Sequence, residues 1–521
     1  MRILLRIYLL IPIVMLCAHG GEVVLSVSDI RISSDFENGS LGSWRINDAG
    51  EIILTHAPGS GDLWYFFRVD GVLHQTLTFV FESARNDLFG DHNLPAWSYD
   101  LNQWSFIKTR FIQPHPTNPQ QTRFSFTCTF AQNHAWIAYT PPFSNTLLDQ
   151  LLNRFAEHPH LHVYDLCETP IEHLHLPILQ ITDSETPKEE KQTILLLCRE
   201  EAYETASSWV GYGAIRFLLS DDPIAAAIKR RCLFLVIPIF DRDGVALGRA
   251  VHPLSRERGE VYWTETWPEK EYSFYEQRQL KRFLQRWKDQ GKTIDLSIRL
   301  HSNSWREDLV RREFCSDANI PAQDAFFMDI LGKEHLPWYR NVDRTLRETR
   351  FSKFVWDVFP QAITASSLHE YLFSDVIAQE FILYKTIDDL MVEGELMARA
   401  IGQSVGVPAS DPPPFLHGAE CYENAGLTAQ TFHVRCIYRD LLNRPPEFVR
   451  VVVNEEPFEL FPVNTETPDY QKGVIFAGFV EAKTESNRHY FQASNGSNTF
   501  RVPYAGERAG PYLLSRDSST K

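Results

Sequence analysis

The sequence is poor in cysteine and has no long run of positively charged residues. Eight Cys in 521 residues are scattered singly, which excludes a disulfide-dense framework and a paired Cys-x-x-Cys zinc pattern. Lys and Arg total 51 against 67 Asp and Glu, so the formal charge is −16. Because binding to phosphates needs clustered Lys and Arg, we expect no nucleic-acid partner.

Long apolar runs are also scarce, and the one that stands out is at the N-terminus. In residues 1–20, Arg2 and Arg6 precede an apolar stretch from Ile7 to Ala18, and Ala18-His19-Gly20 offers small residues for cleavage. About a dozen apolar residues are too few to span about 30 Å of hydrocarbon. This pattern predicts a signal peptide, export to the periplasm, envelope or medium, and no stable membrane span after cleavage. An uncleaved anchor is the alternative.

What is present is ordinary globular composition, with 44% apolar and 23% charged residues. At about 150 residues per domain, the length suggests three or four domains. Residues 22–150 consist of short β-like runs broken by Gly, Asn, Asp and Pro, such as Leu63–Val69 and Phe124–Phe130. Frequent turn signals between short strands predict an N-terminal antiparallel β-sandwich.

The pattern changes between residues 155 and 402. Apolar strand-like runs at Ile194–Cys198, Leu233–Phe240 and Ile294–Leu300 alternate with helical patterns such as Thr205–Leu219. Nearly continuous apolar strands that alternate with helices predict a mostly parallel sheet covered on both faces.

A Pro-rich linker at 403–415 separates this α/β region from a second β-rich region at 416–514. The strand spacing over about 100 residues there is typical of an immunoglobulin-like sandwich. A disulfide between Cys421 and Cys436 is one pairing to consider. The predicted fold class is therefore multidomain, an α/β domain flanked by two β-sandwiches.

Acidic residues and a histidine follow three apolar runs of the predicted α/β domain. Glu201 and Glu204 come after the first strand, His301 ends a later one, and Glu370 precedes the last helical pattern. In open α/β sheets, sites form at the carboxyl ends of strands. Two acids three residues apart, with a His from a neighbouring strand end, can hold one divalent cation and leave a position for water.

Four motifs in this region occur in a characteristic order. They are CREEAYETASSW at 198–209, DRDGV at 241–245, HSNS at 301–304 and SSLHEY at 366–371. The set resembles the zinc carboxypeptidases, in the bacterial branch akin to cytosolic carboxypeptidases, whose catalytic domain follows a β-sandwich. FENGSLGSW at 36–44 and LWYFFRV at 63–69 resemble that sandwich.

The resemblance implies a fold, a cofactor and an activity. It implies that Glu201, Glu204 and His301 bind one Zn²⁺ per chain and that Glu370 activates a water for attack on a peptide carbonyl. Another alignment places Ser366 at the position of Glu370. The substrate would be the C-terminal end of a peptide or a cell-wall peptide, and the flanking sandwiches would position it or dock glycan or protein partners.

The chain departs from the family at the first metal ligand. The family has His where this chain has Glu201. A set of two Glu and one His neutralises the charge of a divalent ion, so bound water should acidify less, and Mn²⁺ or Fe²⁺ compete better with Zn²⁺. Without metal, Glu201 and Glu204 should repel each other, and one should stay protonated.

A second departure concerns the substrate carboxylate. The family's D-x-N-R-like clamp is not recognisable in the corresponding region, 258–264. Arg249 is the candidate that would contact the oxyanion or the carboxylate, with Arg256 and Arg258 as alternatives. Both departures also fit an alternative function, a catalytically impaired pseudoenzyme that serves as a peptide- or glycan-binding scaffold.

Overall fold

The computed structural model describes residues 30–514 except for 86–93, 116, 188–189, 255–273, 303–308, 314–340, 348–349, 372–383, 409–412, 422–424, 428–430, 464–466, 485 and 505. The predicted signal peptide, residues 1–20, lies outside this part of the chain. Among the described residues, no helix is long and apolar enough to cross a membrane.

The N-terminal region forms two five-stranded sheets, with strand orders β1-β4-β10-β6-β7 and β2-β3-β5-β9-β8. On the strand Gln121–Thr129, the alternate residues Thr122, Phe124, Phe126 and Cys128 are buried, and the Phe79 and Phe126 rings of paired strands stack 5.2 Å apart. The strands are β1 (Arg31–Ser33), β2 (Trp44–Ile46), β3 (Ile52–Leu54), β4 (Phe66–Asp70), β5 (Thr76–Arg85), β6 (Ala96–Ser98), β7 (Ser105–Phe106), β8 (Arg110–Pro114), β9 (Gln121–Thr129) and β10 (His134–Ala138).

The middle of the chain forms an eight-stranded sheet of order β11-β12-β14-β13-β15-β18-β16-β17. Strands β14, β13, β15 and β18 run parallel to one another, as the strand–helix alternation predicted. The strands are β11 (Leu161–Glu168), β12 (His175–Ile181), β13 (Gln192–Cys198), β14 (Cys232–Ile237), β15 (Leu296–His301), β16 (Leu309–Glu313), β17 (Asn341–Arg347) and β18 (Ile363–Leu368).

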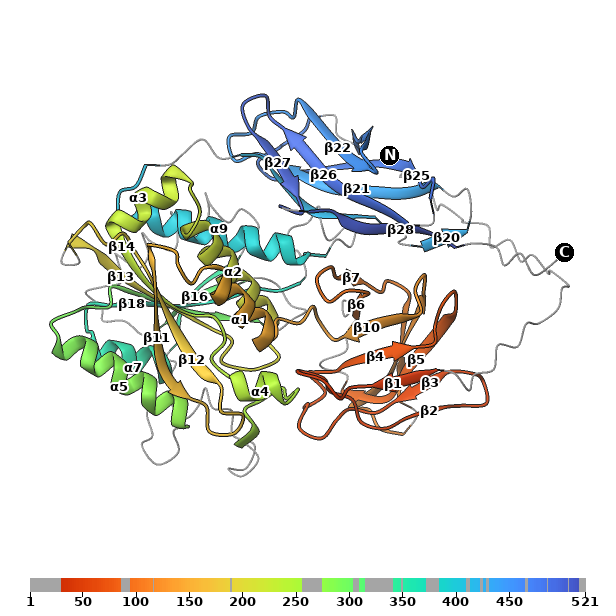
Figure 1. The fold of residues 1–521 in the computed structure, drawn as a ribbon, viewed down its shortest axis with the longest axis horizontal. Coiled ribbons are helices and arrows are strands. Elements are labelled where there is room, and N and C mark those ends of the chain that lie inside the picture. The colour runs from red at the N-terminus through yellow and green to blue at the C-terminus, as the bar shows by residue number, and fades with distance from the viewer. Residues whose placement is uncertain are drawn as a thin grey trace, which may run out of the picture.

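Helices cover both faces of this sheet (Figure 1). Alternate β13 side chains point to opposite faces: Ile194 and Leu196 pack in the core with α2 and α9, while Leu195 and Leu197 pack with α5 and α7. The helices are α1 (Asn145–Arg154), α2 (Thr205–Leu218), α3 (Pro223–Arg231), α4 (Arg242–Ala246), α5 (Tyr275–Asp289), α7 (Arg350–Val358) and α9 (Ile387–Ser404).

The C-terminal region consists of two further sheets, β19-β21-β25-β24 and β20-β28-β26-β22-β23, with β27 paired to β26. Its immunoglobulin-like character, and the exact domain limits, stay predictions. The strands are β19 (Phe415–Cys421), β20 (Ala425–Leu427), β21 (Thr431–Arg439), β22 (Phe448–Val453), β23 (Glu456–Glu459), β24 (Phe461–Pro462), β25 (Val474–Glu481), β26 (Ser486–Ser494), β27 (Thr499–Val502) and β28 (Arg508–Leu514).

The disulfide considered between Cys421 and Cys436 does not form. Cys436 is a buried free thiol, and burial raises the pKa of its thiol group. It lies on β21 opposite Phe476 of β25, in a fully buried stretch of the strand. Cys436 therefore acts as a small apolar core residue.

Helices α2 and α9 approach so closely that their contact requires glycine. A Cβ on Gly394 would lie 1.9 Å from the Val210 carbonyl oxygen, and one on Gly213 would lie 2.1 Å from the Met391 carbonyl oxygen. These are backbone atoms, which cannot rotate away. The pair of glycines thus fixes the position of α2, and with it the loop that precedes α2.

We expect Gly394→Ala to destabilise the protein by about 3 kcal/mol, because overpacking against backbone forces the helices apart. Gly402→Ala on the same helix is the matched control. Its added Cβ would meet only the Ile228 side chain, at 2.5 Å, which can change rotamer. Unfolding midpoints in denaturant would measure both variants, and equal midpoint losses would contradict this account of the contact.

Candidate active site

The predicted site residues come from three adjacent strand ends. In the parallel register, Cys198 at the end of β13 lies beside Leu300 of β15, and His301 lies beside Leu368 at the end of β18. The three strands therefore finish nearly level. Side chains that follow β13, β15 and β18 emerge at one edge of the sheet, as expected for an open α/β fold.

The turn between β13 and α2 is held by the buried Arg199. This residue has a left-handed backbone with φ of 56°, a conformation that costs a non-glycine residue free energy. Its guanidinium offsets that cost: Nε and Nη2 donate to the Ala202 carbonyl at 2.9 and 2.6 Å, and Nη1 donates to the Phe143 carbonyl. The turn that carries Glu201 and Glu204 is thus closed by a side chain within it.

Glu204 and His301 meet, as predicted. The His301 Nδ1 lies 3.0 Å from each Glu204 carboxylate oxygen. Glu204 is also the residue before the first turn of α2, where the helix dipole favours a negative charge. A ring nitrogen and a carboxylate oxygen 3.0 Å apart could both be ligands of one cation, each at about 2.0–2.2 Å from it.

Glu200 is a member of the cluster that the sequence did not single out. Its Oε2 lies 2.5 Å from Arg299 Nη2 and 3.5 Å from His301 Nε2. Glu200 and the Arg299 side chain are both almost fully buried. The positive charge of Arg299 neutralises the negative charge of Glu200. Glu200 therefore pairs with Arg299, while Glu204 faces His301.

Glu201 is buried beside these groups but forms no hydrogen bond with them. Within the described part of the chain, neither of its carboxylate oxygens has a hydrogen-bond partner. Burial raises its pKa well above 4.5, and the charges of Glu204, Asp241 and Glu200 raise it further. In the metal-free protein, Glu201 therefore keeps its proton to a higher pH than a solvated glutamate does.

Glu370 lies two residues beyond β18 and is fully buried. On one side of it, the His369 backbone N–H donates to the His301 carbonyl at 2.9 Å. On the other side, the Tyr371 hydroxyl lies 2.8 Å from the Thr205 hydroxyl, next to Glu204. The backbone of Glu370 is thus fixed beside the cluster, and its role as general base stays a prediction.

Arg249 lies at the boundary with the N-terminal region. Its backbone N–H donates to the Gly244 carbonyl at 2.8 Å, and its guanidinium packs against Gly59, where a Cβ would come within 2.6 Å of Nη1. Its role toward substrate stays a prediction. Arg256 and Arg258, the alternatives, lie outside the described residues.

The donor set fits a divalent cation in composition. Glu201 offers two buried oxygens without partners, and Glu204 and His301 offer donors 3.0 Å apart. The geometry fits less well. Among residues that the structure describes, the ligand atoms of Asp243, His252 and Glu276 all lie within 4.8 Å of one another, whereas Glu201, Glu204 and His301 do not form such a group. A cation at the first cluster would therefore require the Glu201 side chain to move inward.

Solved structures define the class of fold. A metallo-carboxypeptidase from Burkholderia cenocepacia superposes on 72% of this chain and 99% of its own length, with a TM-score of 0.60 and 16% identity. A metallo-carboxypeptidase from Pseudomonas aeruginosa, in complex with (2-guanidinoethylmercapto)succinic acid, covers 72% of this chain and 100% of its own, with a TM-score of 0.56 and 14% identity. The chain has the metallocarboxypeptidase fold.

The sequence comparisons point to one branch of that class. Residues 32–140 match the family model described as the cytosolic carboxypeptidase N-terminal domain. Mouse cytosolic carboxypeptidase 6 is 29% identical over 284 residues, 52% of each chain, and zebrafish cytosolic carboxypeptidase 1 is 29% identical over 209 residues, 36% of this chain and 18% of its own. The resemblance to cytosolic carboxypeptidases is confirmed, although the chain spans about half or less of these relatives.

The prediction of export is wrong. The relatives are cytosolic carboxypeptidases, and the N-terminal family model carries the same name, which conflicts with a secreted or periplasmic protein. The prediction rested on one short apolar run behind two arginines. Such a run reports local hydrophobicity and does not identify a destination.

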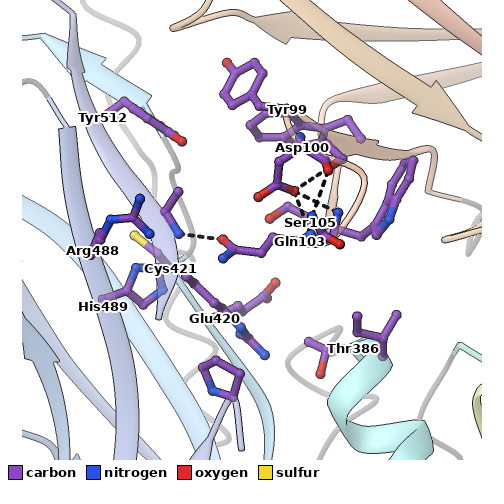
Figure 2. Close-up of a pocket in the computed structure, with 18 of the residues that line it drawn as sticks. Tyr99, Asp100, Gln103, Ser105, Thr386, Glu420, Cys421, Arg488, His489 and Tyr512 are labelled. Atoms are coloured by element: carbon purple, nitrogen blue, oxygen red, sulfur yellow. Dashed lines mark hydrogen bonds between the residues drawn. The ribbon is translucent and has the colours of Figure 1, made fainter. Parts of the chain in front are cut away.

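A separate cavity lies where the N-terminal region, the start of α9 and the C-terminal sheets meet (Figure 2). It has a volume of about 450 Å³. Tyr99 and Tyr512 line it, with ring centroids 5.5 Å apart. Gln103 bridges the two regions, donating to the Glu507 carbonyl at 2.6 Å. The cavity does not include the acid–imidazole cluster.

The raised pKa of Glu201 predicts a pH-dependent effect of Glu201→Gln on the metal-free protein. Below about pH 4.5, where the carboxyl is protonated in both folded and unfolded chains, the variant and wild type should melt together. As the pH rises, the unfolded chain loses this proton first, so wild-type stability falls relative to the variant. Melting curves from pH 4 to 8 with chelator should show the gap opening with pH, and a constant gap would contradict the assignment.

Proposed function

We propose that the chain is a metal-dependent hydrolase that removes residues from the C-termini of peptides. The observation that carries the proposal is the contact between Glu204 and His301 at 3.0 Å, beside the buried, unpartnered oxygens of Glu201. The metallocarboxypeptidase fold and the carboxypeptidase names of the relatives support it. Of the two predicted substrate classes, the C-termini of peptides remain, because cell-wall peptides would require an exported protein.

In this proposal, Glu201, Glu204 and His301 hold the cation. A divalent cation bound there polarises the scissile carbonyl and lowers the pKa of a water. Glu370 takes the proton of the attacking water and returns it to the leaving amine. Glu370 suits this role by its place in the fold, because it lies just after β18 and its backbone is fixed beside the cluster.

The ligand set also bears on which metal is bound. Two carboxylates and one imidazole are harder donors than two imidazoles and one carboxylate, so Mn²⁺ and Fe²⁺ would compete with Zn²⁺. The two negative charges neutralise the ion, and the neighbouring Glu200 is already paired with Arg299. We therefore propose one cation per chain at this cluster, Zn²⁺ in the first instance.

A binding scaffold without catalysis is the second candidate function. The cavity of about 450 Å³ favours it, since tyrosine rings beside polar groups suit a glycan or peptide ligand. Arg488 is exposed at this cavity and would face an acidic group of such a ligand. In this case the acid–imidazole cluster would be a vestige of the fold.

Glu204→Ala should remove the cation of this cluster, lowering the metal content by one ion per chain, and abolish the hydrolysis with it. We expect the wild-type chain, dialysed against buffer with Zn²⁺ and then against buffer alone, to retain metal at the cluster and to cleave a panel of peptides at their C-termini. The variant should bind this cation about 100-fold more weakly or worse and lose activity. Metal analysis and mass spectrometry of the peptides provide the measurements.

An inactive wild type that still binds metal would contradict the hydrolase and favour the scaffold. Binding of a peptide or glycan panel to wild type and to Arg488→Gln then separates the two. A loss of binding in Arg488→Gln would assign ligand binding to the cavity, whereas unchanged binding would count against it.

Glu201→His tests whether the carboxylate at this position limits catalysis. An imidazole removes one negative charge from the ligand set, so the bound water should become more acidic and the rate at neutral pH should rise. We expect a rise in kcat with a lower pKa in the acidic limb of the pH–rate profile. Glu201→Gln, which removes the charge but is a poorer ligand, is the control and should show no gain.

A further inference from the structure

A second buried cluster of potential metal ligands lies at the end of the neighbouring strand β14. Asp243 of α4, His252 of the following loop and Glu276 in the first turn of α5 place one donor atom each within 4.8 Å of the others. Each residue is at most 1% exposed. Donors this close can all reach one ion at about 2.0–2.2 Å after small side-chain shifts.

Two buried carboxylate oxygens, one in this cluster and one beside it, lack hydrogen-bond donors among the described residues. Within the described part of the chain, neither Glu276 Oε2 nor Asp241 Oδ2 has a hydrogen-bond partner, although both residues are 1% exposed. The other Glu276 oxygen lies 3.4 Å from His252 Nε2, which is long for a charge-assisted hydrogen bond. A buried polar atom without a partner carries a desolvation cost that a ligand would offset.

In the part of the chain that the structure describes, the charged groups that act most strongly on His252 are all carboxylates. The carboxylates of Asp241, Asp243 and Glu276 act electrostatically on this one imidazole. Even a fully protonated His252 would leave two negative charges in a dry region if all three acids were ionised. A divalent cation supplies the missing charge.

Asp243 is already oriented like a metal ligand. Its Oδ1 accepts from the Thr169 hydroxyl at 2.6 Å and the Glu172 N–H at 3.0 Å, and its Oδ2 accepts from the Ile171 N–H at 3.0 Å. Such hydrogen bonds fix a carboxylate and leave a lone pair of Oδ2 for a cation. They come from the turn between β11 and β12, so the site would be supported from a third element.

We propose that Asp243, His252 and Glu276 form a second binding site, for a divalent transition-metal cation such as Zn²⁺ or Mn²⁺. Two carboxylates and an imidazole match these ions, whereas Ca²⁺ takes six to eight oxygen ligands. Asp241 stands next to the site as an additional acceptor. The proposal does not depend on hydrolysis at the first cluster.

Binding requires one rearrangement at His252. Its Nδ1 now accepts a long hydrogen bond of 3.3 Å from the Leu254 N–H. If Nε2 binds the metal, Nδ1 must carry the proton of the neutral imidazole and can no longer accept. The exchange gives up one weak hydrogen bond for a metal–nitrogen bond, and metal binding would tie α4 to the start of α5.

The test uses the full-length chain, stripped with chelator and titrated with Zn²⁺ alone or Mn²⁺ alone. The variants are Glu204→Ala, which removes the first cluster, Glu276→Gln, and the double variant. Asp389→Asn is the matched control, because Asp389 and His417 form another buried acid–imidazole pair, at 3.3 Å. Metal stoichiometry by mass spectrometry, affinity by calorimetry and melting temperature are measured for each.

We expect Glu204→Ala to bind one cation per chain and to melt at a higher temperature when it is bound. Glu276→Gln should weaken that binding about 100-fold or more, and the double variant should bind no cation. Asp389→Asn should bind as wild type does. Failure of Glu204→Ala to bind Zn²⁺ or Mn²⁺ overturns the proposal, whether or not Glu276→Gln folds.

Binding by Glu204→Ala that survives Glu276→Gln also overturns it, because the cation would then be held elsewhere. Peptide hydrolysis is scored separately. An inactive wild type with this second site loaded would overturn the proposed hydrolase and leave the second site standing.

Discussion

The structure depends on how it accommodates carboxylates taken out of water at one edge of a sheet. Removing a charged carboxylate from water costs several kcal/mol unless a partner compensates. Glu200 is compensated by Arg299 and Glu204 faces His301, but Glu201 has no comparable contact. Its two oxygens are buried and unpartnered within the described residues. The state of this one carboxyl, protonated or bound to a cation, sets the charge of the whole cluster.

The two acidic clusters are electrostatically linked through Asp241. The charge of Asp241 raises the pKa of Glu201, and burial raises the pKa of Asp241 itself to about 7, against the opposing effect of His252. The Gly244 N–H donates a hydrogen bond to Asp241 Oδ1 at 2.8 Å. A Cβ on Gly244 would clash with the side chains of Asp241 and Ala202. The start of α4 is thus packed against the turn that carries Glu201, so a cation at either cluster would change the charge felt at the other.

The sequence predicted the elements whose residues repeat with a regular period. The parallel strands predicted that Glu204 and His301 lie close together, and the two side chains are 3.0 Å apart; their role as metal ligands stays a prediction. The sequence did not predict the contacts of Glu200. They depend on an irregular turn with a left-handed backbone at Arg199, and hydrophobic periodicity does not indicate the course of such a turn. His252 and Glu276 are 24 residues apart on different elements, so only the folded chain brings them together. Export was predicted from one short apolar run at the N-terminus, a local pattern that does not identify a destination.

If Glu201 is a metal ligand, as proposed, its carboxylate in place of the imidazole expected from the family resemblance would separate cation binding from catalysis. A second carboxylate adds to the negative charge that attracts a divalent ion. The charges of Glu204, Asp241 and Glu200 already act on this position. The same charge lowers the ability of the ion to acidify water or polarise a carbonyl. Tight cation binding and slow hydrolysis are therefore expected from a single cause. For that reason metal content alone cannot establish catalysis in this chain, and the rate with imidazole restored at position 201 is the more direct measure of what the substitution did.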